Sequence, residues 1–147
     1  MNKIPIFLLA VFVSSCSTLP QQYAASANRI LVQGVATGKG DAFNRFMFGQ
    51  LVPGEPTGVT HVQIRSVDGG DVIWVRGYHL GDKVWLEPGV HKVSVMCCTS
   101  YSWGKIMAGT DVDLDVQTGY TYFLAASALK SASDKPHVEV TKKESKS

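Results

Sequence analysis

Residues 84–98 read VWLEPGVHKVSVMCC, and this stretch decides the fold because it holds two strand patterns joined by a turn. Apolar residues occupy every second position before Pro88-Gly89, and Val93 and Val95 continue the alternation after it. A period of two is typical of a strand with one buried face, and Pro-Gly marks a turn. We therefore expect two strands here, with Val95 buried in the middle of a sheet.

Similar apolar runs lie on both sides of this stretch. Asp68-Gly69-Gly70 is a strong hairpin signal, and the run after it is apolar on both faces, which favours a central strand. Residues 100–109 have no such alternation and are expected to form a loop. Further strands are expected at residues 29–36, 62–65, 71–76, 111–116, 119–125 and 137–140.

These runs predict the fold class. Six to eight short strands at regular spacing, with almost no helical pattern, indicate an all-β protein built as an antiparallel β-sandwich. Residues 41–48 are open between a two-turn helix capped by Asp41 and an irregular aromatic loop.

The N-terminus indicates where the chain goes. Lys3, the apolar residues 4–13 and the small residues before Cys16 form the pattern of a secretory signal peptide. The apolar run is shorter than the roughly 20 residues that span a bilayer. The sequence Val13-Ser14-Ser15-Cys16 resembles the bacterial lipobox. The resemblance implies that Cys16 receives a diacylglyceryl group and becomes the new N-terminus, and that Ser17 directs a Gram-negative lipoprotein to the outer membrane.

This interpretation divides the chain. Residues 1–15 are removed, 16–28 form a lipidated N-terminus and tether, 29–140 form the sandwich, and 141–147 form a polar tail. The 132 remaining residues suit one domain with a single core.

The segments LEPGVHKVSV (residues 86–95) and VDLDVQTGYTYFL (residues 112–124) carry a second resemblance. They are similar in architecture to small bacterial lipoproteins with PEGA-like β-sandwich domains. The resemblance implies one hairpin on Pro88-Gly89 and another strand pair that turns at Gly119, with Tyr122 after it. It implies no catalytic residues.

Charge and motifs exclude several classes of function. The formal charge of +2 falls to +1 when the single basic residue of the signal peptide is removed, which is no nucleic-acid-binding pattern. No serine or cysteine lies in an activating motif, and no Cys/His spacing matches a catalytic zinc site. We therefore expect neither an enzyme nor a cofactor.

Two groups of residues remain as candidates for binding. Cys97 shares the parity of the buried valines, whereas Cys98 is expected to face outward beside Met96. Met96 and Cys98 are soft ligands that suit Cu(I); an intermolecular or a vicinal disulfide and two unlinked thiols are the alternatives. The alternating Asp111, Asp113 and Asp115 are interpreted as a solvated strand face that discourages edge pairing.

The second group is aromatic. Clustered exposed aromatic residues mark partner surfaces, unless residues 43–48 cover them as a second small core. The candidates are Trp74, Trp85, Tyr101 and Trp103. The expected role is therefore a lipid-anchored structural or accessory protein that binds an envelope partner, and the alternative is a copper or redox module using Met96, Cys97 and Cys98.

Overall fold

The computed structural model describes residues 21–37, 56–72, 74–75, 78–79, 81–101 and 103–145. The expectations for Cys16 and for residues 41–48 lie outside these ranges. A short 3-10 helix, η1 (Gln21–Tyr23), precedes the strands. The strands are β1 (Ile30–Gly34), β2 (Ala36–Thr37), β3 (Pro56–Val67), β4 (Gly70–Asp71), β5 (Trp74–Val75), β6 (Tyr78–His79), β7 (Lys83–Leu86), β8 (Gly89–Tyr101), β9 (Gly104–Val116), β10 (Tyr120–Ala126) and β11 (Val138–Glu144).

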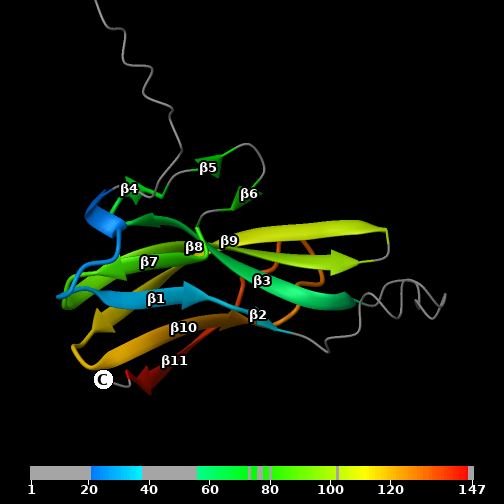
Figure 1. Cartoon of the computed structure of the whole chain (residues 1–147). Helices are drawn as coiled ribbons and strands as arrows, with labels where there is room; N and C mark the ends of the chain where they lie inside the picture. The colour runs from blue at the N-terminus through cyan, green and yellow to red at the C-terminus, as the bar shows by residue number, and fades with distance from the viewer. Residues whose placement is uncertain are drawn as a thin grey trace, which may run out of the picture.

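Two sheets pack face to face, which confirms the all-β sandwich (Figure 1). The four-stranded sheet has the order β11-β10-β1-β7, and the five-stranded sheet has the order β2-β3-β8-β9, with β4 also paired to β3. All strand pairs of these sheets are antiparallel except β1 and β10, which run parallel. The sandwich is therefore mixed at this one pair.

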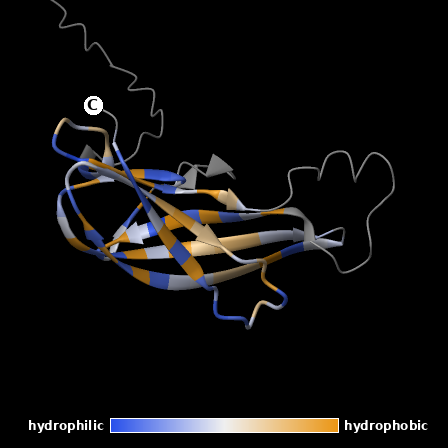
Figure 2. Ribbon diagram, turned by 90° about the horizontal axis from the view of Figure 1, so that it is seen from below, coloured by the Kyte–Doolittle hydropathy of each residue, from blue (hydrophilic) through white to orange (hydrophobic). Residues whose placement is uncertain are grey.

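The core lies between the sheets, where alternate residues of each strand meet. Val32, Val84 and Leu124 enter it from the four-stranded sheet, and Ile64 and Val95 from the five-stranded sheet. Figure 2 shows the matching alternation of apolar and polar residues along the strands. Val95 is 2% exposed, as expected. Full burial of such a side chain stabilises the fold by about 1.5–3 kcal/mol.

The turns on Pro88-Gly89 and Gly119 do not join paired strands, so both expected hairpins are wrong. β7 and β10 belong to the four-stranded sheet, whereas β8 and β9 belong to the five-stranded sheet. Each turn therefore carries the chain from one layer to the other. The left-handed backbone at Gly119, with φ of 85°, suits a glycine at such a reversal.

The hairpin is instead formed by β8 and β9, and the expected loop at residues 100–109 is wrong. These strands pair continuously from Gly89 opposite Val116 to Tyr101 opposite Gly104. Ile106 and Ala108 enter the core in the same parity as Leu114. Their alternation is weak in the sequence because Ala108 is small and Met107, on the outward face, is also apolar.

The expected central strand at residues 71–76 is also wrong. β3 and β4 form the predicted hairpin, with positive φ at both Asp68 and Gly69, but β4 ends at Asp71. Beyond the part of β3 that pairs with β4, Gly81 lies along the edge of β3. Its carbonyl accepts a 2.7 Å hydrogen bond from the Ile64 amide. A Cβ at Gly81 would lie 2.4 Å from the Ile64 carbonyl oxygen, so only glycine permits this approach.

The domain is longer at both ends than expected. Tyr23 is buried, and its hydroxyl lies 3.1 Å from the carbonyl oxygen of Val67 and 3.2 Å from that of Gly70. The chain from η1 onward therefore packs on the sandwich, and the predicted tether cannot extend to residue 28. At the other end β11 pairs with β10 as far as Glu144, so most of the expected tail is an edge strand. Within the described ranges, no helix has the length and apolarity to cross a membrane.

Candidate binding surface on the five-stranded sheet

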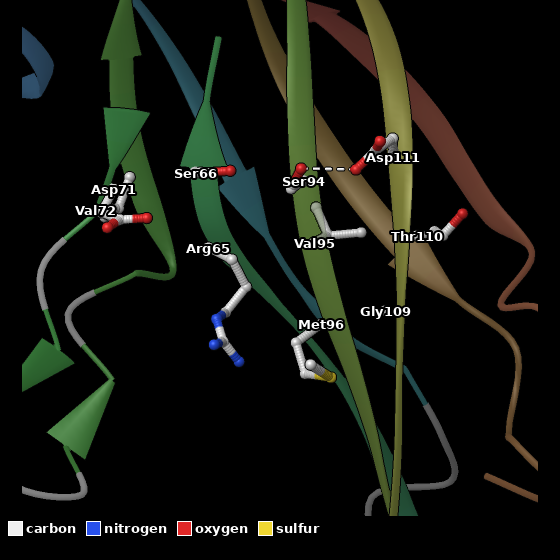
Figure 3. Close-up of a pocket in the computed structure, with 10 residues that line it drawn as sticks. All are labelled: Arg65, Ser66, Asp71, Val72, Ser94, Val95, Met96, Gly109, Thr110 and Asp111. Atoms are coloured by element: carbon white, nitrogen blue, oxygen red, sulfur yellow. Dashed lines mark hydrogen bonds between the residues drawn. The ribbon is translucent and has the colours of Figure 1, made fainter. Parts of the chain in front are cut away.

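The outward face of β3, β8 and β9 carries an open groove of about 840 Å³ beside β4 (Figure 3). Its walls combine apolar groups with hydroxyl groups, two carboxylates and one guanidinium. Ser94 donates a 2.6 Å hydrogen bond to Asp111 across β8 and β9. The residues that line the groove are Arg65, Ser66, Asp71, Val72, Ser94, Val95, Met96, Gly109, Thr110 and Asp111.

Two local irregularities form this groove. The register between β3 and β8 shifts between Ile64 and Ser66, so Arg65 is the extra residue of a β-bulge. A bulge bends its strand and re-aims side chains. On the opposite wall, Gly109 has no side chain, and a Cβ there would lie 3.7 Å from the methyl carbon of Met96. The long Met96 side chain therefore lies over β9.

The groove offers hydroxyl and charged groups to a ligand. Ser94 is paired with a carboxylate, and none of the residues that line the groove is a histidine. The strand face that continues from Asp111 carries the exposed Asp113 and Asp115, which lie opposite Lys92 and Val90 of β8. Among the described residues, no three side chains of the types His, Cys, Asp and Glu are grouped so that they could hold a metal ion.

The two cysteines occupy opposite faces of β8, and both are free thiols. Cys97 is fully buried in the core, as expected. Burial, and after it the neighbouring Cys98, raises the pKa of the Cys97 thiol to about 11. Cys98 lies on the outward face beside Met96, as expected, but it is only 8% exposed. Its position in a strand with neighbours on both sides explains this burial.

The neighbours of Cys98 were not apparent from the sequence. The register places His61 of β3 opposite Cys98 on one side and Met107 of β9 opposite it on the other. His61 is exposed, and Met107 is 43% exposed. Met107 was hidden because its segment has the composition of a loop, and the pairing of His61 depends on a strand 37 positions away.

The aromatic candidates do not form one surface. Tyr101 is buried, with its hydroxyl donating to the carbonyl of Leu129, and its ring stacks on that of Trp103 with centroids 5.3 Å apart. Trp103 is 64% exposed at the tip of the β8–β9 hairpin. Trp85 lies on β7 of the other sheet, where it lines a separate groove of about 500 Å³. Trp74 lies on β5, and its side chain is outside the described part of the structure.

Comparison with known proteins gives no relative: no protein-family model, no curated protein and no solved structure matches this chain.

Proposed function

We propose that this protein is a lipid-anchored, non-enzymatic component of the bacterial outer membrane that faces the periplasm and binds an envelope partner through the tip of its long hairpin. The observation that carries the proposal is the separation of two ends. Figure 1 shows η1 at one end of the sandwich and the tip of the β8–β9 hairpin at the other. The stacked Tyr101 and Trp103 belong to this tip.

The first support is the short connection to the anchor. Residues 13–16 resemble a lipobox, and the described part of the chain begins at η1, which packs on the sandwich through Tyr23. Five residues from Cys16 to Gln21 reach at most about 18 Å, because an extended chain spans about 3.3–3.6 Å per residue. Acyl chains on Cys16 contribute about 0.8 kcal/mol per buried CH₂. The end of the sandwich near η1 is therefore held close to the lipid headgroups.

The second support is the length of the hairpin. The Tyr23 hydroxyl donates a hydrogen bond to the carbonyl oxygen of Val67. Val67 in turn pairs with Val93, close to the start of β8. The thirteen residues of β8 extend the hairpin about 40 Å, at about 3.3 Å per residue. The exposed ring of Trp103 is thus carried away from the membrane. Tryptophan is enriched among the residues that dominate binding energy at protein interfaces, which favours a protein partner.

A photo-crosslinking residue at position 103 tests the proposal in membranes of the source bacterium. We expect one discrete adduct from position 103 and none from position 90, since Val90 is 75% exposed at the opposite end of the same hairpin. Equal adducts from both positions, or none from either, would contradict docking through the tip.

The anchor is tested separately by metabolic labelling with a fatty acid. The Cys16→Ala variant should lose the label and its normal processing, because both reactions use that thiol. Undiminished label in the variant would exclude Cys16 as the attachment site.

A further inference from the structure

We infer that His61, Cys98 and Met107 form a binding site for a soft monovalent metal ion, Cu(I), with Met96 as a fourth ligand. The site lies on the outward face of the five-stranded sheet and uses neither Cys16 nor Trp103. It therefore goes beyond the docking role proposed above and stands independently of it.

Strand register is the first step of the argument. His61, Cys98 and Met107 occupy directly opposed positions on three neighbouring strands, β3, β8 and β9. Cys98 is flanked in the chain by Cys97 and Thr99, which are both fully buried in the core, so its own side chain faces outward. Opposed residues in an antiparallel sheet have their side chains on the same face. All three groups therefore lie in one row across the sheet.

Reach is the second step. Directly opposed residues have Cβ atoms about 4.5–5.5 Å apart. An ion above Cys98 is thus within range of the imidazole on one side and the thioether on the other, without movement of the backbone. Met96 lies two residues from Cys98 on the same face, and its methyl end lies over Gly109 of β9, beside the position of Met107. The absent side chain at Gly109 leaves the space for this approach.

Chemistry is the third step. One thiolate, two thioethers and an imidazole form a set of soft and borderline ligands, which select Cu(I) over hard oxygen-binding cations. Cys98 is recessed at 8% exposure, while Met107 is 43% exposed and His61 is exposed. An ion can therefore enter from solvent and be held over a sheltered sulfur. Binding exchanges the thiol proton of Cys98 for Cu(I), the proton passes to buffer, and neither sulfur nor copper changes oxidation state.

A buried polar atom next to the row is an independent sign of an unfilled interaction. Gln63 lies opposite Met96 and two residues from His61, and it is more than nine-tenths buried. Within the described part of the chain, its Oε1 atom has no hydrogen-bond partner. Leaving a buried acceptor unsatisfied costs about 1–3 kcal/mol. When one ring nitrogen of His61 binds copper, the N–H of its other ring nitrogen is a suitable donor to this Gln63 oxygen. Metal-bound histidines commonly donate their other N–H to an oxygen.

Cu(I) titration tests the site on the full chain, purified in detergent under reducing conditions, against a chelator that reports its own copper complex. We expect one equivalent of Cu(I) per chain. Cys98→Ser removes a metal ligand itself. It should weaken binding by more than about 100-fold, because loss of a residue that only hydrogen-bonds to a metal ligand already costs up to about 100-fold. Met107→Leu and His61→Gln keep size and should each weaken binding by at least about tenfold.

Matched controls use the neighbouring residues of the same types. Cys97→Ala removes a thiol on the opposite face of β8, and His137→Gln removes an exposed histidine outside the row. Both should bind Cu(I) like the unchanged chain. X-ray absorption of the copper complex should show sulfur scatterers with one nitrogen, and circular dichroism should show that every variant keeps its β structure.

Three outcomes would overturn the proposal: non-stoichiometric binding, unchanged affinity in both Met107→Leu and His61→Gln, or equal loss in Cys97→Ala and Cys98→Ser. Loss of copper binding in Cys98→Ser with unchanged crosslinking at position 103 would show that the metal site and the docking tip are separate. Failure of either experiment therefore leaves the other interpretable.

Discussion

Cys97 and Cys98 are neighbours in the chain, yet they lie in different chemical environments because β8 has two unlike faces. The inward face carries Val95, Cys97 and Thr99, all sealed from solvent between two sheets. The outward face is exposed and charged at one end, where Lys92 lies opposite Asp113, and rich in sulfur at the other, where Cys98 lies opposite Met107. One regular ladder thus supports a core on one side and two kinds of surface on the other.

The largest effect should come from a charge on the inward face. Val95→Asp places an unpaired carboxylate where the side chain is 2% exposed, which costs several kcal/mol. That is much of the stability of a small domain. Circular dichroism should show that the variant is already unfolded at room temperature and has no cooperative transition on heating. Val90→Lys is the control on the outward face, where a 75% exposed residue opposite Asp115 should tolerate a charge within about 0.5 kcal/mol.

A smaller loss is expected from the polar part of the core. The Thr99 hydroxyl accepts a 2.9 Å hydrogen bond from the Leu129 amide and lies 3.0 Å from the Thr60 hydroxyl. Thr99→Val keeps the shape of the side chain but leaves both groups without this partner, at a cost of about 1–3 kcal/mol. Chemical denaturation should show the decrease. Ser100→Ala, on the outward face, should change stability by less than about 0.5 kcal/mol, and an equal loss in both variants would contradict the assignment of faces.

Alkaline pH should reveal the effect of burial on the Cys97 thiol. The pKa of Cys97 is raised to about 11 in the folded state, whereas an unfolded thiol titrates near its ordinary value of 9.0. The unfolded chain therefore loses its proton first, and the stability from this thiol, complete below pH 9, declines as the pH rises toward 11. Denaturation midpoints at several pH values should show this decline, and Cys97→Ala should lack that part of it. An unchanged decline in the variant would assign it to other groups.

The smallest effect should come from Asp68, in the turn between β3 and β4. Asp68 accepts hydrogen bonds from the His91 ring at 2.7 Å and the Lys92 amide at 2.8 Å, and these bonds, the His91 bond first, lower its pKa below 3.8. Stability from this carboxylate is present above its unfolded pKa and is lost as the pH falls through the folded value. Because the group is half exposed, we expect less than about 1 kcal/mol.

Comparison of Asp68→Asn with the unchanged chain during acid unfolding measures this contribution. The free energy of unfolding of the variant should depend less steeply on pH below 4, and the values for the two chains should be similar at pH 2. A variant that is equally steep would show that other carboxylates cause the acid sensitivity.

Much of the strand content and the inward faces could be predicted from the sequence. Alternation identified Val93, Val95 and Cys97 as buried, and Asp68-Gly69 predicted the β3–β4 turn, whose two residues both have positive φ. These properties are local: a period of two assigns each side chain to a face, and a turn type follows from the two residues that must adopt left-handed backbone.

The candidate sites were predicted only in part. Met96 and Cys98 were identified as soft ligands, but His61 and Met107 were missed, because nothing near them in the chain indicates which strands they pair with. The rings of Tyr101 and Trp103 stack, but Tyr101 is buried, and Trp85, which was assigned to the same exposed surface, lies on the other sheet. Side-chain type is visible in a sequence, but proximity across strands is not.

By itself, then, the sequence determined that the chain forms strands, where several of its turns lie, and which residues of β8 face the core. Only the tertiary structure decided the partners: the turn after β7 crosses between the sheets, β1 lies parallel to β10, and β8 pairs with β9. The reason is physical. Alternation and turn conformation depend on neighbouring residues, whereas register depends on how two layers close over one core, and that closure brings together residues far apart in the chain.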